Sequence, residues 1–435
     1  MRTSARTDLA IRTARTGGAS RFHVVVMYGL CGALALYPLL ERFIAPVLVV
    51  SFMLTAVSVG ARLFTNGFRV PFSFIGIVWL VYGLVYALWF FIGLTRGNPQ
   101  PYVTQDSFGF LLYVGVMPIL YCHIVFHRLQ DNFFRFIERC SAAIGLLSVA
   151  VVAGFLLVFG EIDFDSMMMT NLFLRSLGFS WTIDHNSGVL GLYSNIAHLA
   201  LLGNAIVLHR YSQHHRKKDI LLLLLFLAAI VLDGRRALVI TAILQLLIAS
   251  PRLMSYLKPL HRLRLLVAAA GICTLLVVGN LDWIAKRFEF SDEDVSTAER
   301  YAQTPALLDK IAENPVFGGG FGTVASYIRS QERPYSYEVD LLATIMKLGA
   351  IGSLLYFGTY FYGVAQASRA RGGIGVFLIS AGLPFFFYMG TNGNQAMSTD
   401  SAVFHIFLFL MIAFSLPPQG RPPAPPARTA ALPEA

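Results

Sequence analysis

The chain has 435 residues, of which 56% are hydrophobic and 13% are charged, and its formal net charge is +10. A soluble globular protein carries about 25% charged residues, so this composition excludes that class and indicates an integral membrane protein. Residues 1–22 hold several arginines and a single acid, Asp8. We interpret them as a basic cytoplasmic tail, with an Arg-rich transit peptide as the alternative.

Apolar runs recur from residue 23 to residue 416, and each is long enough, or nearly so, to cross a hydrocarbon core of about 30 Å. They predict an all-α polytopic fold with about twelve transmembrane helices in a single membrane domain, residues 23–416. The predicted spans lie near residues 23–40, 43–61, 72–94, 107–126, 141–159, 187–208, 220–232, 237–250, 265–281, 341–365, 374–390 and 401–416.

The distribution of charge predicts the orientation of these spans. With the N-terminus in the cytoplasm, most of the 34 lysines and arginines fall in inward segments, and most of the acids fall outside. The net charge is therefore a topology signal, and we expect no nucleic-acid partner. The Pro-rich tail, residues 417–435, is predicted to be disordered and cytoplasmic. The four cysteines show no metal-binding spacing, and we expect no metal and no cofactor.

The segment "DILLLLLFLAAIVLDGRRALVITAILQLLIAS" reads either as one helix of about 30 residues or as two short ones. A turn at Asp233 and Gly234 keeps the basic segments on both sides in the cytoplasm, so we predict two arms of about 13 and 14 residues. Arms of about 20 Å place Arg235 and Arg236 below the outer membrane surface, where charge needs a protein-lined aqueous cavity.

The largest predicted loop, residues 281–340, lies between spans 9 and 10 on the periplasmic side. Ser296 and Glu299 have the spacing of a capping box, and Thr304 followed by Pro305 predicts a second helix start. The glycine run "GGGFG" then allows another group to approach the backbone closely. Its other interpretation is a tight turn back to the membrane.

Three segments resemble, in order, those of the O-antigen ligase and O-antigen polymerase superfamily of bacterial polysaccharide assembly. They are "DGRRALVITAI", "RYAQTPALLDKIAENPVFGGGFG" and "YSYEVDLLATIMKLGAIG". In ligases of this family a His-Asn pair lies eleven residues before the glycine of the last motif. Counting back from Gly349 gives Glu338 and Val339 here, and an aromatic of the family is replaced near Thr304. These departures favour a polymerase over a ligase.

The resemblance implies a membrane glycosyltransferase in the bacterial inner membrane, with its active site facing the periplasm. It would join repeat units on polyprenyl pyrophosphate into O-antigen or exopolysaccharide by inverting transfer, without cofactor or metal. A flippase and a chain-length regulator are possible protein partners. The alternatives are an O-antigen ligase that transfers glycan to a lipid and, from another class, a polysaccharide flippase or transporter.

Arg300 is the candidate cation of the loop, and Glu338 is the candidate general base. Arg235 and Arg236 are candidates for binding the pyrophosphate together with Arg300. Their alternative role is to anchor helix ends or to pair with Asp233. The candidate substrate-approach loop and the weaker candidates complete the set: Gly318, Gly319, Gly320 and Gly322 in the loop, and Asp340, Lys347 and His198 elsewhere. His198 otherwise bonds between helices, and Lys347 otherwise pairs with an acid.

Overall fold

The computed structural model describes residues 20–38, 40–65, 73–159, 164–176, 182–186, 189–193, 196–256, 295–391 and 397–417. The described chain is predominantly helical, as predicted, with one β-hairpin. The helices are α1 (Arg21–Leu36), α2 (Glu41–Thr65), α3 (Phe74–Thr95), α4 (Gln100–Leu111), α5 (Met117–Phe126), α6 (Gln130–Phe159), α7 (Phe164–Ser176), α8 (Ala200–His214), α9 (Lys217–Leu232), α10 (Arg236–Tyr256), α13 (Val295–Glu313), α14 (Asp340–Gln366), α15 (Ile374–Thr391) and α16 (Thr399–Ser415).

Among the described residues, six helices are long and apolar enough to cross a membrane, which supports the assignment to membrane proteins. They cover Phe43–Thr65, Phe74–Thr95, Gln100–Phe126, Gln130–Phe159, Arg236–Ser255 and Asp340–Arg369. Three shorter apolar helices lie at Arg21–Leu36, Gly375–Gly390 and Thr399–Ser415, where spans were also predicted. The predicted ninth span, residues 265–281, lies outside the described residues.

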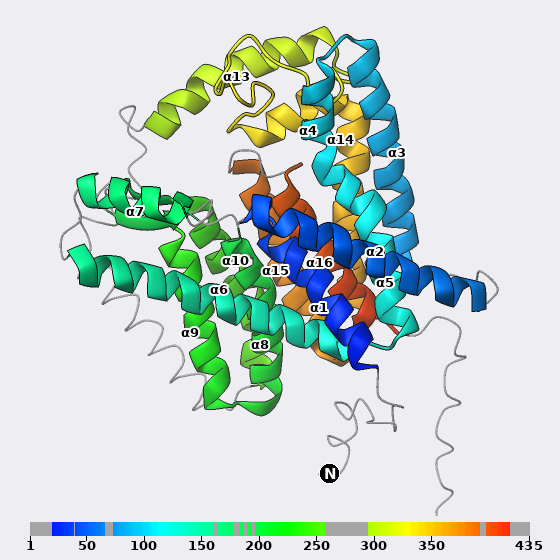
Figure 1. Cartoon of the computed structure of the whole chain (residues 1–435), viewed down its shortest axis with the longest axis vertical. Coiled ribbons are helices and arrows are strands. Elements are labelled where there is room, and N and C mark those ends of the chain that lie inside the picture. The colour runs from blue at the N-terminus through cyan, green and yellow to red at the C-terminus, as the bar shows by residue number, and fades with distance from the viewer. Residues whose placement is uncertain are drawn as a thin grey trace, which may run out of the picture.

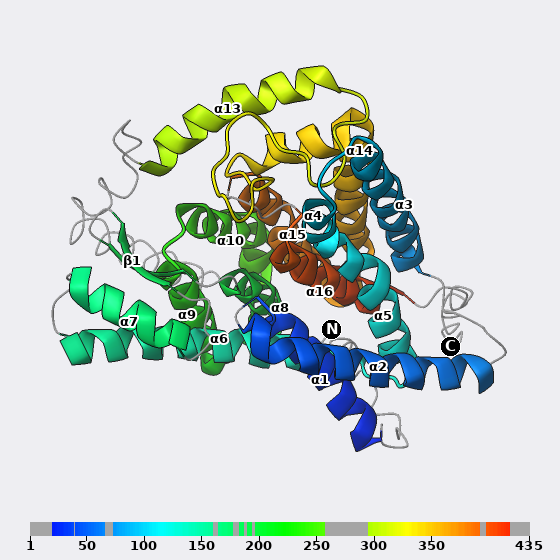
Figure 2. The ribbon, with the colours of Figure 1, turned by 45° about the horizontal axis from the view of Figure 1, so that its top comes forward.

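The helices pack as a bundle with α16 inside it and α13 across one end (Figures 1 and 2). Residues 400–412 of α16 are all buried, which is typical of a helix that is apolar around its whole circumference. Neighbouring pairs include α3 with α14, α10 with α15, and α8 with α9. Because α13 contacts α14, the long segment before α14 is held against the bundle.

The predicted span at residues 187–208 is wrong in its first half. Residues Thr182–Asn186 (β1) and Val189–Tyr193 (β2) form an antiparallel hairpin, and α8 starts only at Ala200. The two strands are separated in the sequence by Ser-Gly, a hairpin signal, and β1 contains Asp, His and Asn, which are poor helix formers.

The predicted turn at Asp233 and Gly234 is confirmed, since α9 ends at Leu232 and Gly234 has a φ of +76°. The predicted arm lengths are wrong for α10, which runs for 21 residues to Tyr256 and contains Pro251. At 1.5 Å per residue α10 is about 31 Å long and α9 about 24 Å. Of these two helices, only α9 is short for a membrane span.

The second helix start at Thr304 and Pro305 is also wrong, because α13 is continuous from Val295 to Glu313. Thr304 Oγ1 donates to the carbonyl of Arg300 within the helix and does not cap a new one. Leu307, in the same turn as Pro305, is fully buried in a cluster with Tyr337 and Met346. This packing stabilises the helix beyond a proline that removes one backbone hydrogen bond.

Candidate functional site

The glycine loop, residues 318–322, is inserted at a break in α14. Gly349 has a φ of +63° and a ψ of −173° within this helix, so the helical hydrogen bonding is interrupted there. The carbonyls of Met346 and Lys347 instead accept from the N–H groups of Gly319 and Gly320, at 2.9 and 2.8 Å. The loop and the break in α14 therefore form one hydrogen-bonded unit.

The other side of the glycine loop contacts α3. Trp89 Nε1 donates to the carbonyl of Phe317 at 2.7 Å, and the carbonyl of Trp89 accepts from Phe321 N. Asn98, which follows α3, donates to the carbonyls of Gly319 and Phe321. A Cβ added to Gly320 would lie 2.2 Å from the backbone nitrogen of Gly93.

These contacts correct the interpretation of the glycine loop as a surface for an approaching substrate. All four glycines of the loop are buried. The groups that approach Gly318, Gly320 and Gly322 closely belong to α14, α3 and α4, and the group nearest Gly319 is the side chain of Thr323 just after the loop. The expectation of close approach is right, but the protein itself supplies the approaching groups. The loop therefore fixes the segment that follows it to the membrane helices.

An ion pair lies beside this loop, within the bundle. Lys347 Nζ is 2.7 Å from Asp106 Oδ1, and both side chains are 6% exposed. The other carboxylate oxygen of Asp106 accepts from Gly322 N at 2.8 Å, and Lys347 Nζ lies 5.5 Å from the ring centre of Tyr335. Of the two roles considered for Lys347, pairing with an acid is the one that the geometry favours.

We expect Asp106→Asn to destabilise the protein by about 3–5 kcal/mol, because it leaves the Lys347 ammonium buried without its carboxylate. The double variant Asp106→Asn with Lys347→Met should recover much of this loss, since the charge is gone and Asn still accepts from Gly322 N. Thermal unfolding of each purified variant in the same detergent measures the loss of stability and its recovery. If the double variant is no more stable than Asp106→Asn, the prediction that the Asp106–Lys347 ion pair is important for stability is wrong.

Glu338 and Arg300, predicted from separate motifs, come together at the end of the bundle where α13 lies. Arg300 Nε is 3.2 Å from Glu338 Oε2, and Arg329 Nη2 is 2.8 Å from Glu338 Oε1. Arg329 also pairs with Glu299, the residue before Arg300 on α13, at 3.4 Å. The side chain of Glu338 is 13% exposed, whereas that of Arg300 is 42% exposed. The guanidinium of Arg300 is thus accessible, with a carboxylate beside it.

Local structure explains how Glu338 is positioned. It lies just before α14, and its backbone N–H donates to Gln303 Oε1 on α13 at 2.7 Å. Tyr337, the preceding residue, is buried, and its hydroxyl accepts from Ala325 N. Glu338 is therefore held both by α13 and by the segment that connects the glycine loop to α14.

A second polar cluster surrounds the turn between α9 and α10. Arg235 Nη1 donates to Tyr388 Oη at 2.9 Å, and Arg235 Nε lies 3.7 Å from the fully buried carboxylate of Asp233. His198 Nε2 donates to the backbone carbonyl of Asp400 at 3.1 Å. This cluster joins residues from the α9–α10 turn, the 3₁₀ turn Ala197–Leu199, α15 and α16.

The charge of Arg333, in the loop, acts on the Asp400 carboxyl together with that of Arg235. Arg236 opens α10 and is partly exposed, and Asp340 opens α14 and is buried.

Sequence reasoning missed five charged or polar residues of these clusters. Asp106 had a usable signal, because it and Lys347 are opposite charges in apolar spans and are expected to pair. Arg329 and Arg333 were visible as arginines in the polar segment after the glycine loop. Tyr388 and Asp400 lie far from Arg235 in the sequence, and no local pattern connects them.

The chain matches no protein-family model and no curated protein. Its apolar helices define the class as a helical membrane protein. The activity is therefore inferred from the charged clusters and from the resemblance of the three sequence segments.

Proposed function

We propose that the protein is a polysaccharide polymerase that joins oligosaccharide repeat units carried on polyprenyl pyrophosphate. In this proposal it spans the bacterial inner membrane about twelve times and works at the periplasmic face. The observation that carries the proposal is the meeting of Arg300, Arg329 and Glu338. Guanidinium groups can bind the anionic carrier, and a carboxylate can accept the proton of the acceptor hydroxyl.

The arginines have the chemistry to bind the pyrophosphate. Guanidinium forms two parallel hydrogen bonds with a phosphate, and Arg300 and Arg329 are both partly exposed. The carboxylate of Glu338 is paired with both guanidinium groups. A pyrophosphate that binds to the two arginines would release this carboxylate from them.

The released carboxylate can then serve as the general base. A hydroxyl oxygen of the acceptor sugar bonds to the anomeric carbon of the donor, and its proton goes to Glu338. The bond from the anomeric carbon to the pyrophosphate oxygen breaks, and the polyprenyl pyrophosphate leaves with the electron pair. A single displacement inverts the anomeric centre and needs no enzyme nucleophile.

Arg235 and Arg236 are proposed as further pyrophosphate ligands at head-group depth, beneath the loop. Arg235 is 14% exposed and is held by Tyr388 and Asp233, so its guanidinium is fixed in place.

The polysaccharide profile of a deletion strain tests the function. A polymerase predicts single repeat units on the final acceptor, with no longer chains. Full-length chains that remain on the carrier lipid would indicate a ligase instead. Repeat units that stay on the cytoplasmic side of the membrane would indicate a flippase.

We expect Arg300→Lys and Arg329→Lys each to lose most polymer formation while the charge is retained. A lysine ammonium is a point charge and cannot form the planar pair of hydrogen bonds that guanidinium gives to phosphate. The measurement is polymer yield from lipid-linked repeats in membranes with matched protein levels. Lysine variants with normal yield would show that these arginines only hold the loop in place.

A further inference from the structure

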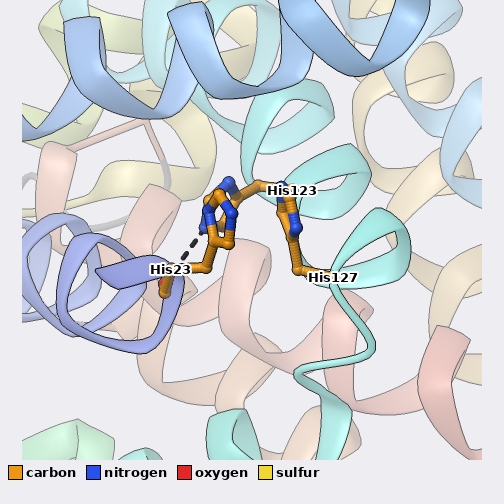
Figure 3. A group of neighbouring side chains, drawn as sticks. All are labelled: His23, His123 and His127. Carbon is orange, nitrogen blue, oxygen red and sulfur yellow. Dashed lines mark hydrogen bonds between the residues drawn. The ribbon is translucent and has the colours of Figure 1, made fainter. Parts of the chain in front are cut away.

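Three histidines from two segments of the chain meet at the end of the bundle opposite α13. His23 lies in the first turn of α1, His123 in the last turn of α5, and His127 directly after α5 (Figure 3). One ring nitrogen of each lies within 4.8 Å of the other two. The cluster is remote from the charged groups around α13 and has no part in the proposed reaction (Figure 1).

The hydrogen bonds of His123 fix its tautomer. Its Nε2 donates to the backbone carbonyl of His23 at 3.2 Å, so the proton is on Nε2 and Nδ1 carries a lone pair. His123 is fully buried, and its Nδ1 has no hydrogen-bond partner among the described residues. A ligating histidine normally donates its other ring N–H to a carbonyl or carboxylate. His123 is thus oriented like a metal ligand.

The other two rings are close to each other and to one hydroxyl. His23 and His127 stack with ring centres 3.5 Å apart, and Ser58 Oγ lies 3.0 Å from His127 Nε2 and 3.4 Å from His23 Nδ1.

We infer that His23, His123 and His127 form a binding site for a divalent transition-metal ion that favours imidazole, with Zn²⁺ as the probe. Tetrahedral Zn²⁺ with Zn–N bonds of about 2.0–2.1 Å places its nitrogens about 3.3 Å apart. The separations are at most 4.8 Å, and closing them on one ion requires the stacked rings of His23 and His127 to rotate apart, because the lone pair of each ring lies in its own plane. Ser58 or water can take the fourth position, which three histidines leave open.

A metal bound here would tie α1 to the end of α5 and to the turn that starts α6. The free energy of binding would stabilise this end of the bundle, since the site requires the folded arrangement. The inference is independent of the polymerase proposal. The sequence analysis expected no metal because the cysteines show no ligand spacing. His123 and His127 are four residues apart, but His23 lies 100 residues before His123 and no local pattern connects it to them.

The test is Zn²⁺ binding to the full-length chain, purified in detergent with a tag that contains no histidine. We expect about one strongly bound Zn²⁺ per chain in equilibrium dialysis, and a higher midpoint of thermal unfolding when Zn²⁺ is added. His123→Gln keeps a donor for the carbonyl of His23 but lacks the imidazole lone pair. We expect it to weaken binding by more than about 100-fold and to abolish the thermal shift.

The matched control is the double variant His214→Gln with His215→Gln, which changes two exposed histidines outside the cluster. It should bind Zn²⁺ like the unmodified chain. His127→Gln repeats the test with a second ligand in case His123→Gln folds poorly. Binding that is equal in the unmodified chain and in His127→Gln, or that is lost in the control, would overturn the site.

Discussion

Glu338→Gln is expected to slow polymer formation by about 10²- to 10⁴-fold, which is the usual effect of losing a general base. Gln has nearly the same shape as Glu but cannot take the proton of the acceptor hydroxyl. The measurement is the rate and length distribution of chains made from lipid-linked repeats, in membranes with matched expression.

The control for this prediction is Glu313→Gln at the end of α13. Glu313 is also a paired carboxylate, 2.7 Å from Lys310 Nζ, but its side chain is 55% exposed and the pair is local. The Glu313→Gln variant should leave polymer formation unchanged. Because Glu338 also holds Arg300 and Arg329, limited proteolysis should be compared between variants to detect a displaced loop. Chains of normal length at the normal rate in Glu338→Gln would show that another group is the base.

Gly320→Ala is expected to detach the glycine loop from the membrane helices. Gly320 has a φ of +82°, which costs about 1–2 kcal/mol for a residue with a Cβ. The Cβ would also lie 2.2 Å from Gly93 N and 2.5 Å from Gly93 Cα on α3, where backbone cannot move aside locally. Overpacking of this kind adds about 1–3 kcal/mol, so we expect about 2–5 kcal/mol in total.

Gly97→Ala separates backbone strain from the steric clash. Gly97 also has a positive φ, of +78°, but nothing lies within 4 Å of an added Cβ. It should therefore show only the strain, about 1–2 kcal/mol. Thermal unfolding in detergent and protease cleavage within residues 323–339 measure both variants. Equal effects of the two substitutions would mean that contact with α3 contributes little to holding the loop.

How much the sequence determined can be judged from particular elements. The long apolar runs of α3, α6 and α14 were predictable because a membrane requires such a run in each span. The turn at Asp233 and Gly234 was predictable from charge on both sides and from a glycine that tolerates a positive φ. Arg300 and Glu338 were found as candidates through motifs, but as separate residues.

Only the tertiary structure decided what these residues contact. Thr304 and Pro305 carry a local start signal, yet burial of Leu307 against Tyr337 and Met346 keeps α13 continuous. The glycines signalled close approach, but not that the approaching backbone is that of α3 and α14. Arg300 reaches Glu338, and His123 reaches His23, through the packing of segments far apart in the chain. Local propensity describes a residue's own turn or helix, whereas these contacts depend on which helices pack together.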